Sequence, residues 1–149
     1  MYLQSESRYL TVEYLVRLKH PFYQLREPLT QRLCYYFPTI EIEGGARVRY
    51  IGIDTPEVYP QTKYYGPEAW AKNRELVEGK VVTLEKDVTE ADAYGRLLRY
   101  VYVDGVFVNG ELVRLGYARA IAYPPDTKYQ ERLAQLEEEA RGAGRGLWR

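Results

Sequence analysis

The 149-residue sequence is poor in the side chains that bind transition metals, with one cysteine, Cys34, and one histidine, His20. A single cysteine excludes an internal disulfide, and a single histidine excludes a histidine-rich metal centre. Zinc sites combine several such side chains, so zinc chemistry is not expected here. Any metal that the chain binds should therefore be a hard cation held by oxygen ligands.

The sequence also lacks an excess of charge of either sign. Its 21 basic and 21 acidic residues give a formal net charge of +0, so a local arginine cluster would have to attract any nucleic acid. No apolar stretch approaches membrane-spanning length, and the start carries neither the basic residues nor the apolar run of a signal peptide. We therefore expect no membrane association and, for the chain as it stands, a cytoplasmic location.

Tyrosine is the residue in clear excess, with 16 copies against 3 phenylalanines. Tyrosine suits strands, interfaces and stacking on nucleic-acid bases, so its abundance alone does not discriminate between these uses. A hydrophobic content of 46% is enough for one domain with one core. We divide the chain into an atypical N-terminal segment of uncertain structure, residues 1–38, and a globular domain, residues 39–149.

Alternating apolar residues and turn signals predict several short strands and three helices. The expected strands cover about residues 10–18, 39–43, 46–53, 81–84, 97–103, 106–108 and 118–123, with hairpin turns at Gly44-Gly45 and Asp104-Gly105. The expected helices cover about residues 66–78, 110–115 and 127–141, the last starting from the capping-box spacing of Thr127 and Gln130. This order favours a mainly β fold with helices (α+β), a five-stranded barrel of OB type with about three helices.

The most informative stretch joins the end of one expected strand to an acidic turn, Arg49-Tyr50-Ile51-Gly52-Ile53-Asp54-Thr55-Pro56-Glu57. Proline cannot donate to a ladder and restricts the residue before it, so the strand should stop there. The strand thus presents Arg49, and its end presents two carboxylates, Asp54 and Glu57. Carboxylates can hold a hard cation and arginine binds phosphate oxygens in pairs, so the combination suits phosphate chemistry. The alternative is a plain strand-to-helix turn, with Thr55 as N-cap and Pro56 as the first helical residue.

A second charged group lies in the polar loop Asp92-Ala93-Tyr94-Gly95-Arg96, where Gly95 gives the backbone the freedom to direct Tyr94 and Arg96 separately. Together with the acidic turn, this loop resembles the staphylococcal nuclease, or thermonuclease, family. Further matches follow in the same order: Tyr65-Gly66-Pro67-Glu68-Ala69, Val108-Asn109, Glu111-Leu112-Val113-Arg114, Gly116 and Gly144-Arg145-Gly146-Leu147-Trp148. The resemblance covers about residues 39–149.

The resemblance implies a hydrolase, an endonuclease that uses calcium (Ca²⁺) to cleave phosphodiester bonds of DNA and RNA, preferably single-stranded. Carried over residue by residue, it implies that Asp54 binds calcium through its carboxylate and Thr55 through its main-chain carbonyl. It also implies that Glu57 positions or deprotonates the attacking water. Arg49 and Arg96 would bind the phosphate and stabilise the charge of the transition state.

The same resemblance implies residues that contact the nucleic acid or support the site. Tyr94 would lie along the nucleotide, and Asn109 would make a structural hydrogen bond. Tyr123 is a further candidate for contact with single-stranded nucleic acid. Lys63, in the loop beside the acidic turn, is a candidate for holding substrate, with a solvated loop lysine as the alternative.

One position departs from the family pattern. The family typically carries Asp-Gly-Asp-Thr before the first hairpin, and its second aspartate is the other carboxylate ligand of calcium. This chain has Tyr36-Phe37-Pro38-Thr39 there, and Pro38 has no side-chain oxygen. Glu41 and Glu43 should point to the opposite face of the strand from Pro38, because side chains alternate along a strand. We therefore expect weakened calcium binding, with Asp54 as the remaining strong ligand and Glu57 as a candidate second one.

Two explanations of this departure remain open. The metal site has decayed in a diverged member of the family, or the segment upstream of Thr39 arises from a shifted reading frame or a misassigned start. The leading functional hypothesis is a calcium-dependent nuclease with an impaired metal site. The alternatives are a non-catalytic module that binds single-stranded nucleic acid on the same face, and a protein-interaction domain with a tyrosine-rich surface. Because the sequence has no heptad repeat, we expect a monomer.

Overall fold

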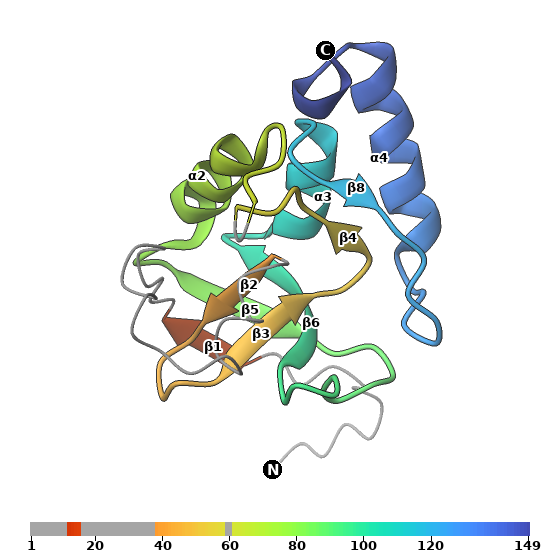
Figure 1. Ribbon diagram of the computed structural model, residues 1–149. Helices are drawn as coiled ribbons and strands as arrows, with labels where there is room; N and C mark the ends of the chain where they lie inside the picture. The colour runs from red at the N-terminus through yellow and green to blue at the C-terminus, as the bar shows by residue number, and fades with distance from the viewer. Residues whose placement is uncertain (1–11, 16–37, 59–60) are drawn as a thin grey trace.

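Short strands and three α-helices alternate along the chain in the computed structural model, which describes residues 12–15, 38–58 and 61–149 (Figure 1). The predictions for the rest of segment 1–38 lie outside these residues. In chain order the elements are β1 (Val12–Leu15), β2 (Thr39–Glu41), β3 (Arg47–Tyr50), β4 (Ile53–Asp54), α2 (Gly66–Val77), β5 (Val81–Glu85), β6 (Leu97–Val103), β7 (Val106–Phe107), α3 (Val108–Arg114), β8 (Arg119–Ala120), α4 (Gln130–Gly142) and the short 3-10 helix η3 (Gly146–Trp148).

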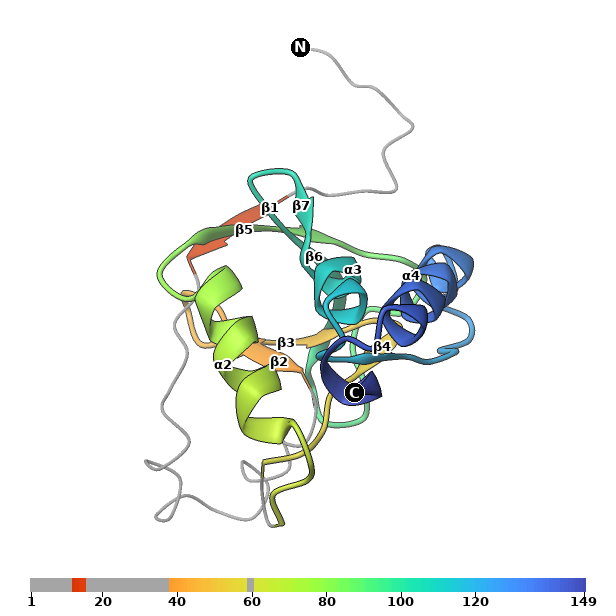
Figure 2. The same cartoon turned by 90° about the horizontal axis from the view of Figure 1, so that it is seen from above.

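The main sheet has the strand order β1-β5-β6-β3-β2, with β7 paired to β6. The pairing of β3 with β6 is parallel, and the other pairings are antiparallel. Figure 2 shows that β1 and β5 lie on one side of the molecule and β2 and β3 on the other, with β6 between them, so the sheet is strongly curved. The predicted α+β fold of OB type is confirmed.

The strand predicted over residues 46–53 is broken in two, so the prediction of one continuous strand was wrong. β3 ends at Tyr50, and a turn at Ile51 and Gly52 precedes β4. Gly52 has φ of 77°, and a Cβ atom there would lie 2.7 Å from the side chain of Leu133, so this turn needs glycine. β4 then leaves the main sheet and pairs with β8. The break carries Asp54 away from the ladder that holds Arg49.

Side chains alternate across β2 as the sequence predicts. Ile40 and Ile42 are almost fully buried, and Pro38 is buried as well. Thr39 and Glu41, between them, are half-buried. The position at which the family carries an aspartate thus belongs to the buried side of this segment. The core to which these residues belong also includes Val48, Tyr50, Ile51, Ile53, Val82, Leu84, Leu98, Tyr100, Val101, Val108, Leu112 and Leu133.

The helices lie together at one end of the sheet, where α3 packs between α2 and α4 (Figure 1). α2 matches its prediction closely, whereas α3 begins at Val108, two residues before the predicted start. The capping box predicted for α4 was wrong: Tyr129 occupies the N-cap position, and no side chain caps the helix. Thr127 instead accepts a hydrogen bond from the Gln130 amide through its main-chain carbonyl, at 3.1 Å. None of the helices in the described ranges has the length and apolar character needed to cross a bilayer.

Candidate active site

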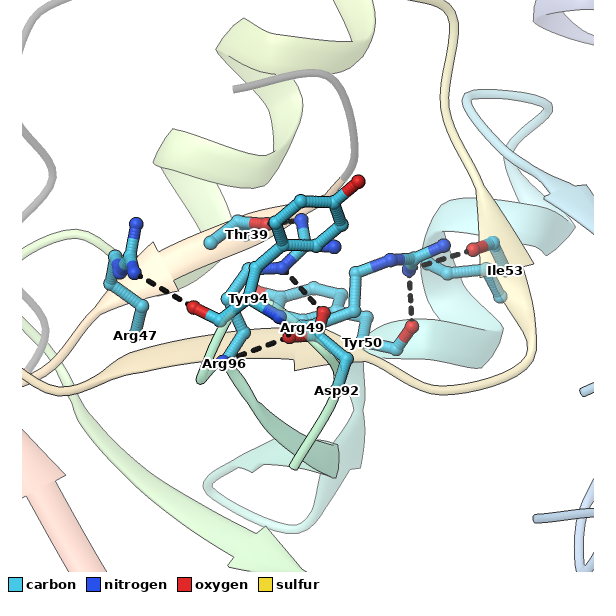
Figure 3. Close-up of polar contacts among 8 residues, drawn as sticks. All are labelled: Thr39, Arg47, Arg49, Tyr50, Ile53, Asp92, Tyr94 and Arg96. Carbon is cyan, nitrogen blue, oxygen red and sulfur yellow. Dashed lines mark hydrogen bonds and ion pairs between the residues drawn. The ribbon is translucent and has the colours of Figure 1, made fainter. Parts of the chain in front are cut away.

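Arg49 is the central arginine of the candidate site. It lies on β3, which is flanked by β2 and β6 in the main sheet. Its side chain bridges the break between β3 and β4, donating to the carbonyl oxygen of Ile53 at 3.0 Å and to that of Tyr50 (Figure 3). The residue is only 3% exposed. Burial lowers the pKa of Arg49 to about 10, and the nearby negative charge of Asp54 opposes this shift. The guanidinium therefore stays cationic at neutral pH and has a fixed orientation.

Arg96, 4% exposed, is the second buried cation. Its Nε donates to Oδ2 of Asp92 at 2.6 Å, and its Nη1 lies 3.4 Å from Oγ1 of Thr39 (Figure 3). Thr39 is directly opposite Arg49 in the β2–β3 register, so the two arginines approach each other from neighbouring segments. The positive charge of Arg96 contributes to lowering the pKa of Arg49, as expected for close like charges.

Asp92 organises the loop that carries Arg96. Its Oδ1 accepts from the main-chain amides of Tyr94 at 2.9 Å and Arg96 at 3.0 Å, while its Oδ2 holds the Arg96 side chain. Asp92 belongs to the sequence motif of this loop, but no role was predicted for it. An aspartate followed by a glycine-containing turn is typical of a side chain that accepts hydrogen bonds from main-chain amides two to four residues later, and this pattern could have predicted the role of Asp92.

Two tyrosines face the arginine pair. The centre of the Tyr94 ring is 5.4 Å from the guanidinium of Arg96, and that of Tyr123 is 6.0 Å from the guanidinium of Arg49. Tyr94 is 54% exposed, and Arg47 supports its loop by donating to the Tyr94 carbonyl at 3.1 Å (Figure 3). An exposed aromatic ring next to a buried cation is suited to a ligand that combines a base with a phosphate.

The acidic turn leaves one carboxylate oxygen without a hydrogen-bond partner. Oδ1 of Asp54 is buried and accepts no hydrogen bond. Burial raises the pKa of Asp54, Glu57 raises it further, and Arg49 and Lys63 lower it. Residues 55–58 form no helix. The alternative prediction, with Thr55 as the N-cap of a helix that starts at Pro56, was therefore wrong. The next helix begins only at Gly66.

The oxygen atoms of this turn fit a hard cation, although they are few. The orphan Oδ1 of Asp54 is such a ligand, and the Thr55 carbonyl and the Glu57 carboxylate follow directly in the chain. Among the described residues, no group of three or more histidines, cysteines, aspartates or glutamates is arranged to hold a metal. Pro38 contributes only its main-chain oxygen, which accepts from the Tyr50 amide at 3.1 Å. The candidate oxygen ligands for a hard cation therefore include fewer charged groups than tight calcium sites use.

Glu57 and Lys63 are joined by an ion pair, with the Lys63 Nζ 2.9 Å from the Glu57 Oε2. Lys63 thus lies against the acidic turn. Arg49 lies near Asp54 of the same turn, and Tyr94 and Tyr123 lie next to the two arginines. Asn109, fully buried, braces this arrangement: it accepts from the Val101 amide and donates to the Ile51 carbonyl, both at 2.9 Å. The predicted structural hydrogen bond of Asn109 is confirmed, and it holds β6 against the β3–β4 break.

Comparison with known proteins gives matches that agree with one another. A family model described as staphylococcal nuclease homologue matches residues 47–149. The chain is 42% identical over 106 residues to the SPbeta prophage-derived endonuclease YokF of Bacillus subtilis, covering 68% of this chain and 36% of that protein. It is 40% identical over 104 residues to the thermonuclease of Staphylococcus hyicus, covering 68% and 62%. It is 42% identical over 106 residues to endonuclease YncB of Bacillus subtilis, covering 68% and 50%. The matched region spans about a third to less than two thirds of these relatives.

Proposed function

The chain belongs to the staphylococcal nuclease family, and from this premise we propose that it is a calcium-dependent nuclease that hydrolyses phosphodiester bonds of DNA and RNA. The names of its relatives, endonuclease and thermonuclease, support a nuclease function. The observation that carries the proposal is the pair of buried arginines, Arg49 and Arg96, beside the carboxylates of Asp54 and Glu57.

The arginines are the groups that bind the phosphate in this proposal. Arg49 is fixed by the carbonyl oxygens that it contacts, and Arg96 is fixed by Asp92, so neither side chain must become ordered when substrate binds. Displacement at phosphorus depends chiefly on positioning and on electrostatic stabilisation of the charge on the phosphoryl oxygens. Donors that are already oriented stabilise that charge without a reorganisation cost.

The carboxylates have separate tasks. Glu57 is the general base: it orients the attacking water and takes its proton, which requires a carboxylate that is accessible from solvent, as its 26% exposed side chain is. Asp54 and the Thr55 carbonyl are the residues that would hold calcium. Bound there, calcium would supply positive charge for the phosphate oxygens and lower the electrostatic cost of bringing a phosphate near two carboxylates.

Tyr94, Tyr123 and Lys63 are the proposed contacts with the nucleic acid. The tyrosine rings would stack on bases or sugars, which favours single strands because their bases are unstacked. Lys63 would reach a neighbouring phosphate. The chain is proposed to act as a monomer.

A non-catalytic binding module is the second candidate, and Pro38 is the observation that favours it. Calcium affinity falls as charged ligands are lost, so a chain without an acid at this position could retain only the phosphate-binding surface. The arginine pair and the tyrosines would serve such a module equally well.

Hydrolysis of heat-denatured DNA separates the two candidates. We expect the purified chain to cleave it in millimolar calcium and not in excess chelator, with cleavage restored when calcium is returned. The measurement is the release of acid-soluble nucleotides over time. A folded sample that binds the DNA without cleaving it at any calcium concentration would support the binding module instead.

Asp54→Asn tests the calcium ligand directly. We expect calcium binding, measured by isothermal titration calorimetry, to weaken on the order of tenfold or more, because one charged ligand is lost from an already small set. Asn preserves the shape of the side chain, and thermal unfolding in chelator checks that the variant folds. Unchanged calcium affinity would contradict the assignment of Asp54.

A further inference from the structure

The ion pair between Lys63 and Glu57 is held by more than its two charges. The Lys63 amide donates to the main-chain carbonyl of Glu57 at 2.9 Å, and the Gly66 amide donates to the Lys63 carbonyl at 3.0 Å. The backbone thus folds back on Glu57 at Lys63, and the lysine side chain leaves from the point where the two segments touch.

The start of α2 closes the same contact from the other side. A Cβ atom on Gly66 would lie 2.6 Å from the carbonyl oxygen of Glu57 and 3.4 Å from that of Pro56, so only glycine allows this approach. Thr62 adds a hydrogen bond from its hydroxyl to the Val58 carbonyl, at 3.2 Å. The position of Lys63 relative to Glu57 is therefore set by packing and by main-chain hydrogen bonds, unlike that of a lysine on a free surface.

The charge of Lys63 acts on both acidic residues of the turn. Glu57 raises the pKa of Asp54 and Lys63 lowers it, so the ammonium group partly compensates the repulsion between the two carboxylates. The metal cation would have the same effect. Because the family's other acidic ligand is replaced by Pro38, the turn presents two carboxylates, and one of them is already paired with a cation of the chain.

We propose that Lys63 is an internal counter-ion that competes with a divalent cation for the acidic turn. In the metal-free chain its ammonium neutralises Glu57, and this positive charge beside Asp54 opposes the binding of a divalent cation there. A tethered competitor is present at a high effective concentration, so it lowers the apparent affinity of the metal. This inference rests on the proposed function, since it concerns the calcium site of that nuclease.

Lys63 would also make a second contact during the reaction. A dication held by Asp54 and the Thr55 carbonyl would repel the ammonium group of Lys63 and loosen its contact with Glu57, and the lysine side chain, 61% exposed, would then be open to the solvent. A phosphate of the nucleic acid could then accept a hydrogen bond from Lys63, and Glu57 would be free to act as base. Exchange of one ionic partner for another would couple metal binding to substrate binding.

Lys63→Met is the test, with calcium chloride as the titrant and calorimetry as the readout. We expect the variant to bind calcium roughly three- to tenfold more tightly than the wild-type chain, the effect of removing one positive charge close to a dication in water. Lys63→Arg keeps the charge and should restore an affinity near that of the wild type. Thermal unfolding with and without calcium supplies a second readout, since tighter binding gives a larger stabilisation.

Lys72→Met is the matched control. Lys72 forms an ion pair of the same length, 2.9 Å, with Glu75 on α2, so the change removes one positive charge and one ion pair away from the acidic turn. Calcium affinity should stay near the wild-type value. Unchanged affinity in Lys63→Met, or an equal gain in Lys72→Met, would overturn the counter-ion role alone. Absence of calcium binding in both the wild type and Lys63→Met would overturn the calcium proposal as well.

Discussion

Glu57→Gln is expected to abolish most cleavage, with a loss of about a hundredfold or more in the rate of hydrolysis of denatured DNA. Glutamine has the size of glutamate and can still accept a hydrogen bond, but it cannot take a proton from water near neutral pH. Binding of a single-stranded oligonucleotide in chelator should remain, because Arg49 and Arg96 are unchanged. The measurements are initial cleavage rates in calcium and fluorescence anisotropy of a labelled oligonucleotide.

The same substitution also breaks the ion pair with Lys63, so Lys63→Met provides the necessary control. It removes the identical ion pair but keeps the carboxylate. We expect a much smaller change of rate in Lys63→Met than in Glu57→Gln. Cleavage by the Glu57→Gln variant at the wild-type rate would exclude Glu57 as the base. Loss of oligonucleotide binding together with cleavage would show that Glu57 supports the binding surface instead.

Local sequence signals predicted the elements that depend on a few neighbouring residues. The turn dipeptides Gly44-Gly45 and Asp104-Gly105 specify hairpins, and the structure forms them between β2 and β3 and between β6 and β7. The alternation of Ile40 and Ile42 with polar neighbours likewise predicted which side of β2 is buried. Each of these features follows from backbone angles or from burial at a spacing of two.

Features that depend on distant partners were not predictable from the same signals. The need for glycine at the Gly52 break comes from Leu133 of α4, which lies against it and is 81 residues away in the sequence (133 − 52). The parallel pairing of β3 with β6, which brings the Arg96 loop to Arg49, depends on how the sheet curves. The position of Lys63 over Glu57 similarly needs the main-chain contacts of a folded loop. Composition and motifs named the candidate residues, while the contacts between them required the fold.

Arg49→Lys is expected to lower cleavage by about a hundredfold or more although the positive charge remains. Lysine has no planar fork of donors, so it cannot contact the carbonyl oxygens of Tyr50 and Ile53 and present two further donors to a phosphate. Since these carbonyls lie beside the buried strand end, losing a donor there should also reduce the free energy of unfolding by about 1–2 kcal/mol. Cleavage rates in calcium and unfolding in urea measure the two effects separately.

Arg47→Lys is the control for this change, because Arg47 lies two residues earlier on β3 and therefore on the same face. Arg47 is more exposed than Arg49 and contacts the main-chain oxygen of Tyr94, so its replacement should cost far less activity. If both variants lost activity equally, the strand would be acting through its net charge. Loss of activity in the folded Arg49→Lys variant alone would show that the reaction needs the fixed geometry of the Arg49 guanidinium. The β3–β4 break supplies this geometry, because it presents two carbonyl oxygens to a single buried side chain.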